Sequence, residues 1–155
     1  MNDINGMNDI NALLWKYGVT LESMGESAVA LYEPKGELDE ESKLEIQKRF
    51  QREVEKQLLD PNVYLLIDAA IYLDEKHKLS DSEKRTGPAF ILADELIGMV
   101  IAEFIGGKKA LFNFIRYDQV KPGILSKLNV FLDDAIAGLI AGCMTKIFEN
   151  SLKKL

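Results

Sequence analysis

Four apolar residues recur at intervals of four in a segment that is otherwise charged: Ile46, Phe50, Val54 and Leu58. Positions four apart lie on one face of an α-helix, so the segment is predicted to be an amphipathic helix capped by Asp39. Other helical segments precede and follow it, and alternating strand patterns are scarce. The sequence predicts an all-α fold, a compact single-domain bundle of about six to eight helices with a central apolar helix.

Capping residues, glycines and prolines give the bounds of the predicted helices. These helices are 8–17, 21–32, one that begins after Asp39, 61–78, 89–105, 108–117 and 129–152. The fourth is apolar almost all round over 63–72, which predicts a central position for it. The polar segment 80–87 is predicted to be a loop and 119–123 a turn.

Length, charge and cysteine content narrow the class of protein. The 155 residues are expected to form one domain, with residues 1–10 flexible. The 19 basic and 25 acidic residues give a net charge of −6, which argues against a nucleic-acid binder. A single cysteine, Cys143, excludes an internal disulfide and a thiolate zinc site, and it fits a cytoplasmic protein. Because the most apolar segments contain charges, no transmembrane segment is predicted.

Two predicted helices carry an acidic pair followed by small residues at intervals of four. Asp94-Glu95 precedes Gly98, Ala102 and Gly106, and Asp133-Asp134 precedes Gly138 and Gly142. Each helix therefore presents a ridge with a carboxylate at one end and small residues along the rest. Small residues let two helix backbones approach closely. We expect the two ridges to bring their carboxylates together among apolar side chains.

Converging carboxylates would repel one another and be poorly solvated. Either their pKa values are raised or a cation binds them, and oxygen ligands favour Mg²⁺, with Mn²⁺ as a substitute, over Zn²⁺. Solvated acids at the helix ends are the simpler alternative. Asp118 could be a further ligand or a helix-end charge. Lys121, in a rigid Lys-Pro-Gly turn, is the first candidate for binding phosphate, and Arg116 is the second. His77, the single histidine, is expected to be solvated, which argues against histidine-phosphoenzyme chemistry.

Three sequence segments together resemble the phosphatidylglycerophosphatase A family over roughly residues 63–148. They are Asp-Glu-Leu-Ile-Gly (94–98), Arg-Tyr-Asp-Gln-Val-Lys-Pro-Gly-Ile (116–124) and Phe-Leu-Asp-Asp-Ala-Ile-Ala-Gly (131–138). The resemblance implies Mg²⁺-dependent removal of a terminal phosphate from a monoester. Lipid-acting members have several membrane-spanning helices, and this chain looks closer to a soluble branch. Segments 93–99, 107–114 and 140–146 are similar to the archaeal α-ribazole-5′-phosphate phosphatases of cobalamin biosynthesis.

The sequence thus predicts a cytoplasmic, Mg²⁺-dependent phosphomonoesterase that hydrolyses α-ribazole 5′-phosphate and forms a homo-oligomer. The expected metal ligands are Asp94, Glu95, Asp133 and Asp134, with Asp94 and Asp134 also catalytic and Lys121 and Arg116 binding the substrate. A lipid phosphatase at a membrane surface and a non-catalytic helical oligomerisation module are the alternatives. Whether water or an aspartate attacks the phosphorus stays open.

Overall fold

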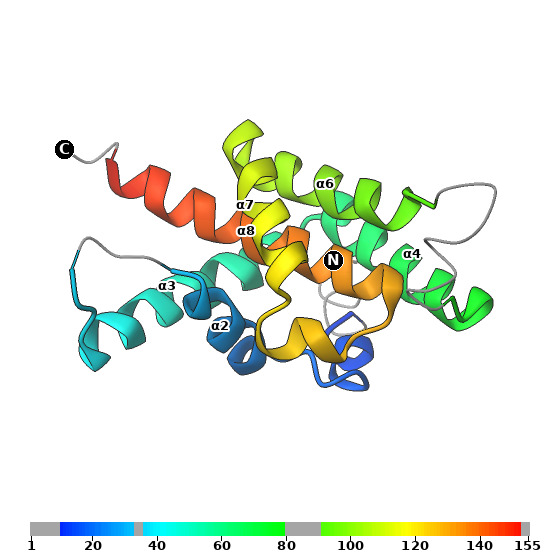
Figure 1. Ribbon diagram of the computed structural model, residues 1–155, viewed down its shortest axis with the longest axis horizontal. Coiled ribbons are helices and arrows are strands. Elements are labelled where there is room, and N and C mark those ends of the chain that lie inside the picture. Colours follow the sequence, from blue (N-terminus) through cyan, green and yellow to red (C-terminus); the bar gives the residue numbers. More distant parts are fainter. Residues whose placement is uncertain (1–9, 33–35, 80–90, 153–155) are drawn as a thin grey trace.

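The computed structural model describes residues 10–32, 36–79 and 91–152, and within them every regular element is a helix (Figure 1). Residues 10–15 are helical. The later elements are α2 (Leu21–Ala30), α3 (Glu40–Leu58), α4 (Pro61–His77), α6 (Ala93–Gly106), α7 (Lys108–Val120), the 3₁₀ helix η1 (Gly123–Lys127) and α8 (Val130–Leu152). The all-α prediction is confirmed. Residues 1–10 were predicted to be flexible: 1–9 lie outside the described residues, as does the predicted loop 80–87, and Ile10 is helical and buried.

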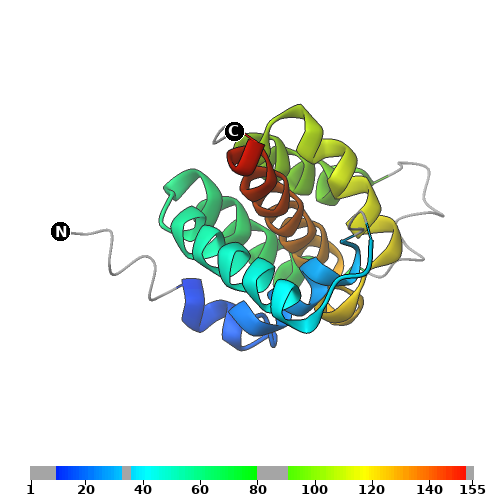
Figure 2. The ribbon, with the colours of Figure 1, turned by 90° about the vertical axis from the view of Figure 1, so that its left-hand side faces the viewer.

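The central helix of the bundle is α8, around which α3, α4, α6 and α7 pack (Figure 2). Every residue of α8 from Val130 to Met144 is buried. The prediction that 63–72 is the central helix is wrong, because α4 leaves Leu65 and Tyr72 57% and 56% exposed. The reason is the size of the side chains. The alanines and glycines of α8 allow neighbouring helices to approach it closely, whereas α4 carries large side chains, of which Leu65 and Tyr72 stay exposed.

Three helices, α2, α3 and α4, begin directly after a side chain that caps them. The Asp39 carboxylate accepts a hydrogen bond of 2.7 Å from the Ser42 backbone N–H at the start of α3, which confirms the predicted cap. The bounds of the other helices were less predictable. The described part of α6 begins at Ala93 rather than at 89, and α7 continues to Val120 rather than ending at 117. Residues 123–127 of the following segment form a 3₁₀ helix.

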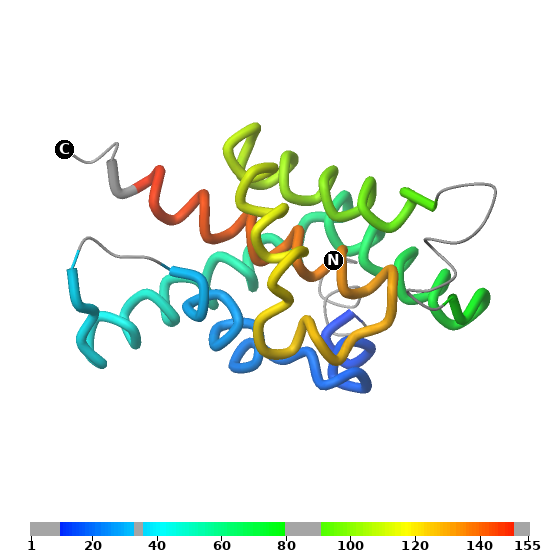
Figure 3. Tube along the Cα trace, in the orientation of Figure 1, coloured from blue at the N-terminus to red at the C-terminus, as the bar shows by residue number. Residues whose placement is uncertain are grey.

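The tight contact in this bundle is between α6 and the first half of α8, which run side by side (Figure 3). A methyl group added at Gly98 would lie 2.5 Å from the Asp134 carbonyl oxygen, and one at Gly138 would overlap the Gly98 backbone. Further along the contact, a methyl group at Gly106 would lie 2.8 Å from the Gly142 carbonyl oxygen. Backbone therefore meets backbone along the two predicted ridges.

A buried tyrosine joins α7 to α2, and its loss is expected to destabilise the protein. The Tyr117 hydroxyl donates a 2.6 Å hydrogen bond to the Ala28 carbonyl in a site where Tyr117 is 1% exposed. We expect Tyr117→Phe to lower the free energy of unfolding by about 1–3 kcal/mol, because the carbonyl loses a donor that water does not replace. Urea unfolding measures this. Tyr17→Phe, which removes the exposed hydroxyl that donates to Glu75, is the control and should cost less than about 1 kcal/mol.

Candidate metal centre

Two carboxylates from different helices meet where α6 and α8 touch. Asp94, near the start of α6, is 1% exposed, and Asp134, in the second turn of α8, is fully buried. Their carboxyl groups interact side by side. The close backbone contact at Gly98 and Gly138 makes this possible, because each glycine lies one turn after one of the acids. The structure therefore brings these two predicted residues together in the interior.

A third helix brings another acid to the same place. Asp118, in the last turn of α7, interacts with the Asp134 carboxyl, and oxygens of Asp118, Asp133 and Asp134 all lie within 4.8 Å of one another. The sequence left a choice between a ligand and a helix-end charge for Asp118, and the structure places it beside the other acids. We refer to Asp94, Asp118, Asp133 and Asp134 as the aspartate cluster.

A lysine lies against this aspartate cluster. Lys121 ends α7 in the left-handed conformation, with φ of 51°, and this turn directs its side chain back toward α8. Its ammonium group donates to Asp133 Oδ2 and lies 3.8 Å from Asp118 Oδ1. Burial lowers the pKa of Lys121, but the hydrogen bond to Asp133 and the charges of the nearby aspartates outweigh burial and raise it overall. Lys121 therefore stays positively charged beside the four acids.

Asp134 has the surroundings expected of a cation ligand. Burial and the neighbouring Asp118 and Asp94 carboxyl groups raise its pKa to about 10. Within the described part of the chain, no backbone N–H, hydroxyl or basic side chain donates a hydrogen bond to either Asp134 oxygen. Buried carboxylate oxygens that lie beside other carboxyl groups are typical of sites that bind hard divalent cations such as Mg²⁺. The residues present therefore fit the predicted metal ion.

The raised pKa of Asp134 predicts how stability depends on pH. Between the ordinary value of 3.8 and about 10, the folded protein holds a proton that the unfolded chain has released. The resulting stabilisation is complete below pH 3.8 and is lost as the pH rises through about 10. We expect the free energy of unfolding in EDTA to fall by up to about 1.4 kcal/mol per pH unit from about pH 7 to 9. Urea unfolding at several pH values measures the slope, and an equal slope in Asp134→Asn would contradict this origin.

Two of the predicted site residues lie elsewhere. The Glu95 side chain is exposed, since one residue turns a helix by about 100° and Asp94 already points inward. The Arg116 guanidinium donates a 2.8 Å hydrogen bond to the Leu31 carbonyl at the end of α2. Arg116 is two residues from Asp118, so the two side chains leave α7 on opposite sides. The structure thus groups four of the six predicted site residues, adds Asp118, and leaves Glu95 and Arg116 outside the aspartate cluster.

Sequence reasoning missed a further buried acid, Asp74, close to the start of α8. Its two carboxylate oxygens accept hydrogen bonds from the Phe131 and Leu132 backbone N–H groups. A weak signal was present in the sequence. An acid in the last turn of a helix is unfavourable next to the negative end of the helix dipole, so Asp74 in α4 needed a compensating interaction.

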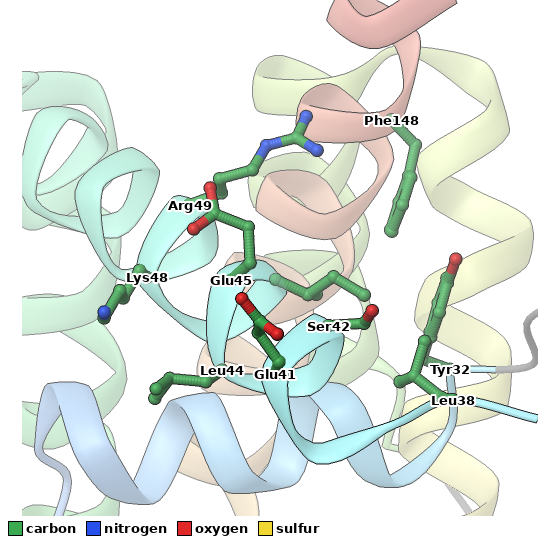
Figure 4. Close-up of a pocket in the computed structure, with 10 residues that line it drawn as sticks. Tyr32, Leu38, Glu41, Ser42, Leu44, Glu45, Lys48, Arg49 and Phe148 are labelled. Atoms are coloured by element: carbon green, nitrogen blue, oxygen red, sulfur yellow. The ribbon is translucent and has the colours of Figure 1, made fainter.

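A separate pocket of about 680 Å³ lies at the other end of α8 (Figure 4). Its wall includes the stacked rings of Tyr32 and Phe148, whose centroids are 4.9 Å apart, and charged residues of α3 such as Arg49. Phe148 follows Asp134 by fourteen residues of one helix, which is roughly 21 Å. The pocket is therefore too far from the aspartate cluster to belong to the same small-molecule site.

The fold and site together define an all-α protein with a buried cluster of carboxyl groups, which could hold a metal ion, at the junction of three helices. Residues 48–149 match the family described as phosphatidylglycerophosphatase A, and the chain belongs to this family. It is a family of phosphatases, which supports a phosphatase-like function. The predicted family is thus confirmed. Within the described ranges, no helix has the length and apolar character that crossing a bilayer requires.

Individual proteins resemble this chain in sequence or in fold. An uncharacterized protein of Methanocaldococcus jannaschii is 49% identical over 100 residues, which cover 61% of this chain and 79% of that protein. The low temperature requirement C protein from Listeria monocytogenes has the same fold, with a TM-score of 0.72 at 24% identity over 94% of this chain and 96% of the other. The protein ypjQ from Bacillus subtilis also has this fold, with a TM-score of 0.72 at 23% identity over the full length of both chains.

Proposed function

We propose that this protein is a Mg²⁺-dependent phosphomonoesterase that hydrolyses α-ribazole 5′-phosphate to α-ribazole and inorganic phosphate. Membership of a phosphatase family supports the reaction class. The substrate rests on the similarity of segments 93–99, 107–114 and 140–146 to the archaeal α-ribazole-5′-phosphate phosphatases. A cytoplasmic location and a homo-oligomer are part of the same prediction, and light scattering during size-exclusion chromatography tests the latter.

The observation that carries the proposal is the burial of Asp134 among other carboxylates. Such an arrangement is unfavourable in an empty protein core and becomes favourable when a divalent cation neutralises it. Asp94, Asp118, Asp133 and Asp134 are the residues that would hold the ion. When bound, Mg²⁺ would neutralise charge on the phosphoryl oxygens and make water a better nucleophile.

The chain's own residues would then perform two tasks. The Lys121 ammonium, which is held beside the aspartate cluster by Asp133, would bind a phosphoryl oxygen of the substrate. An aspartate carboxylate would accept the proton of the attacking water, because the only histidine, His77, is exposed. The water oxygen would form a bond to phosphorus as the ester P–O bond breaks, and the proton that the aspartate accepted would pass to the departing ribose oxygen, which leaves as the alcohol.

Phosphate release from two substrates tests the proposal. Purified protein is assayed with α-ribazole 5′-phosphate and with phosphatidylglycerophosphate in detergent, each with Mg²⁺ and with EDTA. We expect release from the first substrate with Mg²⁺ and none with EDTA. Release from the lipid alone would replace the nucleotide substrate with a lipid one. Release from neither would favour the non-catalytic helical module, and release that EDTA does not reduce would overturn metal dependence.

A further inference from the structure

A buried carboxylate of α4 accepts hydrogen bonds from backbone N–H groups at the N-terminal end of α8. Asp74 is 5% exposed, and its Oδ1 and Oδ2 accept 2.8 Å hydrogen bonds from the backbone N–H groups of Phe131 and Leu132. The first N–H groups of a helix have no partner inside the helix, and a capping side chain next to them usually satisfies one. Here one side chain from a distant part of the sequence satisfies two.

The two bonded amides directly precede the acids of α8. The next amide, that of Asp133, donates a 2.8 Å hydrogen bond to the Asn129 carbonyl and so makes the first bond within the helix. The rotation of this first turn decides where the following side chains point. In the observed rotation Asp133 meets Lys121, and Asp134 meets the acids of α6 and α7.

Asp74 itself is firmly placed. It lies one turn before the end of α4, where its carbonyl accepts a 3.1 Å hydrogen bond from the Lys78 backbone N–H that closes the helix. Its negative charge also faces the positive end of the α8 dipole, which strengthens both hydrogen bonds. A fixed group on α4 therefore holds the start of α8.

We propose that Asp74 is a positioning residue for the metal centre, because it fixes the first turn of α8 and through that turn the carboxylates of Asp133 and Asp134. This inference rests on the proposed function in that the aspartate cluster binds a divalent cation. A residue that only stabilised the fold would change the unfolding temperature and leave cation affinity unchanged. A positioning residue changes both, because the ligands must point together before the ion arrives.

Calorimetric titration with Mn²⁺ alone tests the inference in the full-length protein. Asp74→Asn keeps the size of the side chain but replaces one acceptor with an NH₂ group that faces a backbone N–H. We expect this variant to bind Mn²⁺ roughly ten- to a hundredfold more weakly than the wild type. Glu75→Gln is the matched control: it removes the adjacent, exposed negative charge, whose described contact is with Tyr17, and should bind Mn²⁺ as the wild type does.

A second measurement separates this inference from the proposed function. Hydrogen exchange at the amides of Asp133 and Asp134, followed in EDTA, should accelerate in Asp74→Asn and not in Glu75→Gln. If the wild type does not bind Mn²⁺, the proposed function loses its metal ion. If exchange at these amides is unchanged in Asp74→Asn, Asp74 does not position the first turn of α8. Equal Mn²⁺ affinity in the two variants would also overturn the inference. If Asp74→Asn does not fold, Asp74→Glu keeps the charge, moves the carboxylate by one methylene, and should bind Mn²⁺ more weakly than Glu75→Gln.

Discussion

Asp134→Asn is expected to abolish phosphate release and, at the same time, to stabilise the metal-free protein. Activity should fall on the order of a thousandfold or more, because a neutral amide neither binds a hard cation well nor accepts a proton from water. Stability should rise by at least about 1 kcal/mol at neutral pH, because the unfavourable burial of an ionisable group ends. Opposite changes in activity and stability are the mark of a functional site rather than of a structural residue.

Phosphate release with Mg²⁺ and thermal unfolding in EDTA measure the two effects. Asp68→Asn makes the same chemical change at an exposed position of α4, and both activity and stability should stay near those of the wild type. Circular dichroism should show a helical signal near that of the wild type in both variants. Retained turnover in Asp134→Asn would displace Asp134 from the metal centre, and lowered stability would mean that its carboxyl group makes a favourable interaction in the empty protein.

Gly138→Ala is expected to destabilise the protein by about 1–2 kcal/mol, although alanine is the better helix former. The added methyl group would overlap the Gly98 backbone of α6, which has no rotamer by which to move away. Overpacking of this kind costs typically 1–3 kcal/mol and outweighs the gain of roughly 1 kcal/mol in helix propensity. Because α6 carries Asp94, pushing α6 away from α8 should also weaken Mn²⁺ binding.

Gly25→Ala provides the matched control within the same protein. Gly25 also lies inside a helix, α2, but a methyl group there would lie 3.3 Å from the terminal nitrogen of Gln51, a flexible side chain. We expect its free energy of unfolding to stay within about 1 kcal/mol of the wild type, with helix propensity favouring a gain. Urea unfolding of both variants gives the comparison. Equal effects would mean that the approach of α6 to α8 does not depend on glycine.

Gly98 and Gly138 show which features of the site can be predicted from the sequence. Spacing by four predicted that Gly98 and Gly138 lie on the same helical faces as Asp94 and Asp134, because helix geometry is local and repeats every 3.6 residues. The need for small residues at a close helix contact is equally general. The starts of helices with a side-chain cap were predictable for the same reason, since a cap such as Asp39 acts on amides two or three residues away.

Other assignments needed the position of each helix in space. Adjacent acids such as Asp94 and Glu95 look alike in a sequence, but they leave a helix about 100° apart and only one can face a given partner. Arg116 and Asp118 differ in the same way on α7. Whether Asp118 is a possible ligand or only a helix-end charge depended on whether α7 ends beside α8. The packing of the helices decides this.

The sequence by itself determined the helices, the acid and glycine ridges of α6 and α8, and the family resemblance, because each depends on residues close together in the chain. The tertiary structure alone decided that α8 is central, that Asp118 and Lys121 join the acids, and that Asp74 closes the start of α8. Those contacts join residues far apart in the chain, such as Asp74 and Leu132, which are 58 positions apart. Interactions over such separations follow from how whole helices pack, and many packings are compatible with the same local pattern.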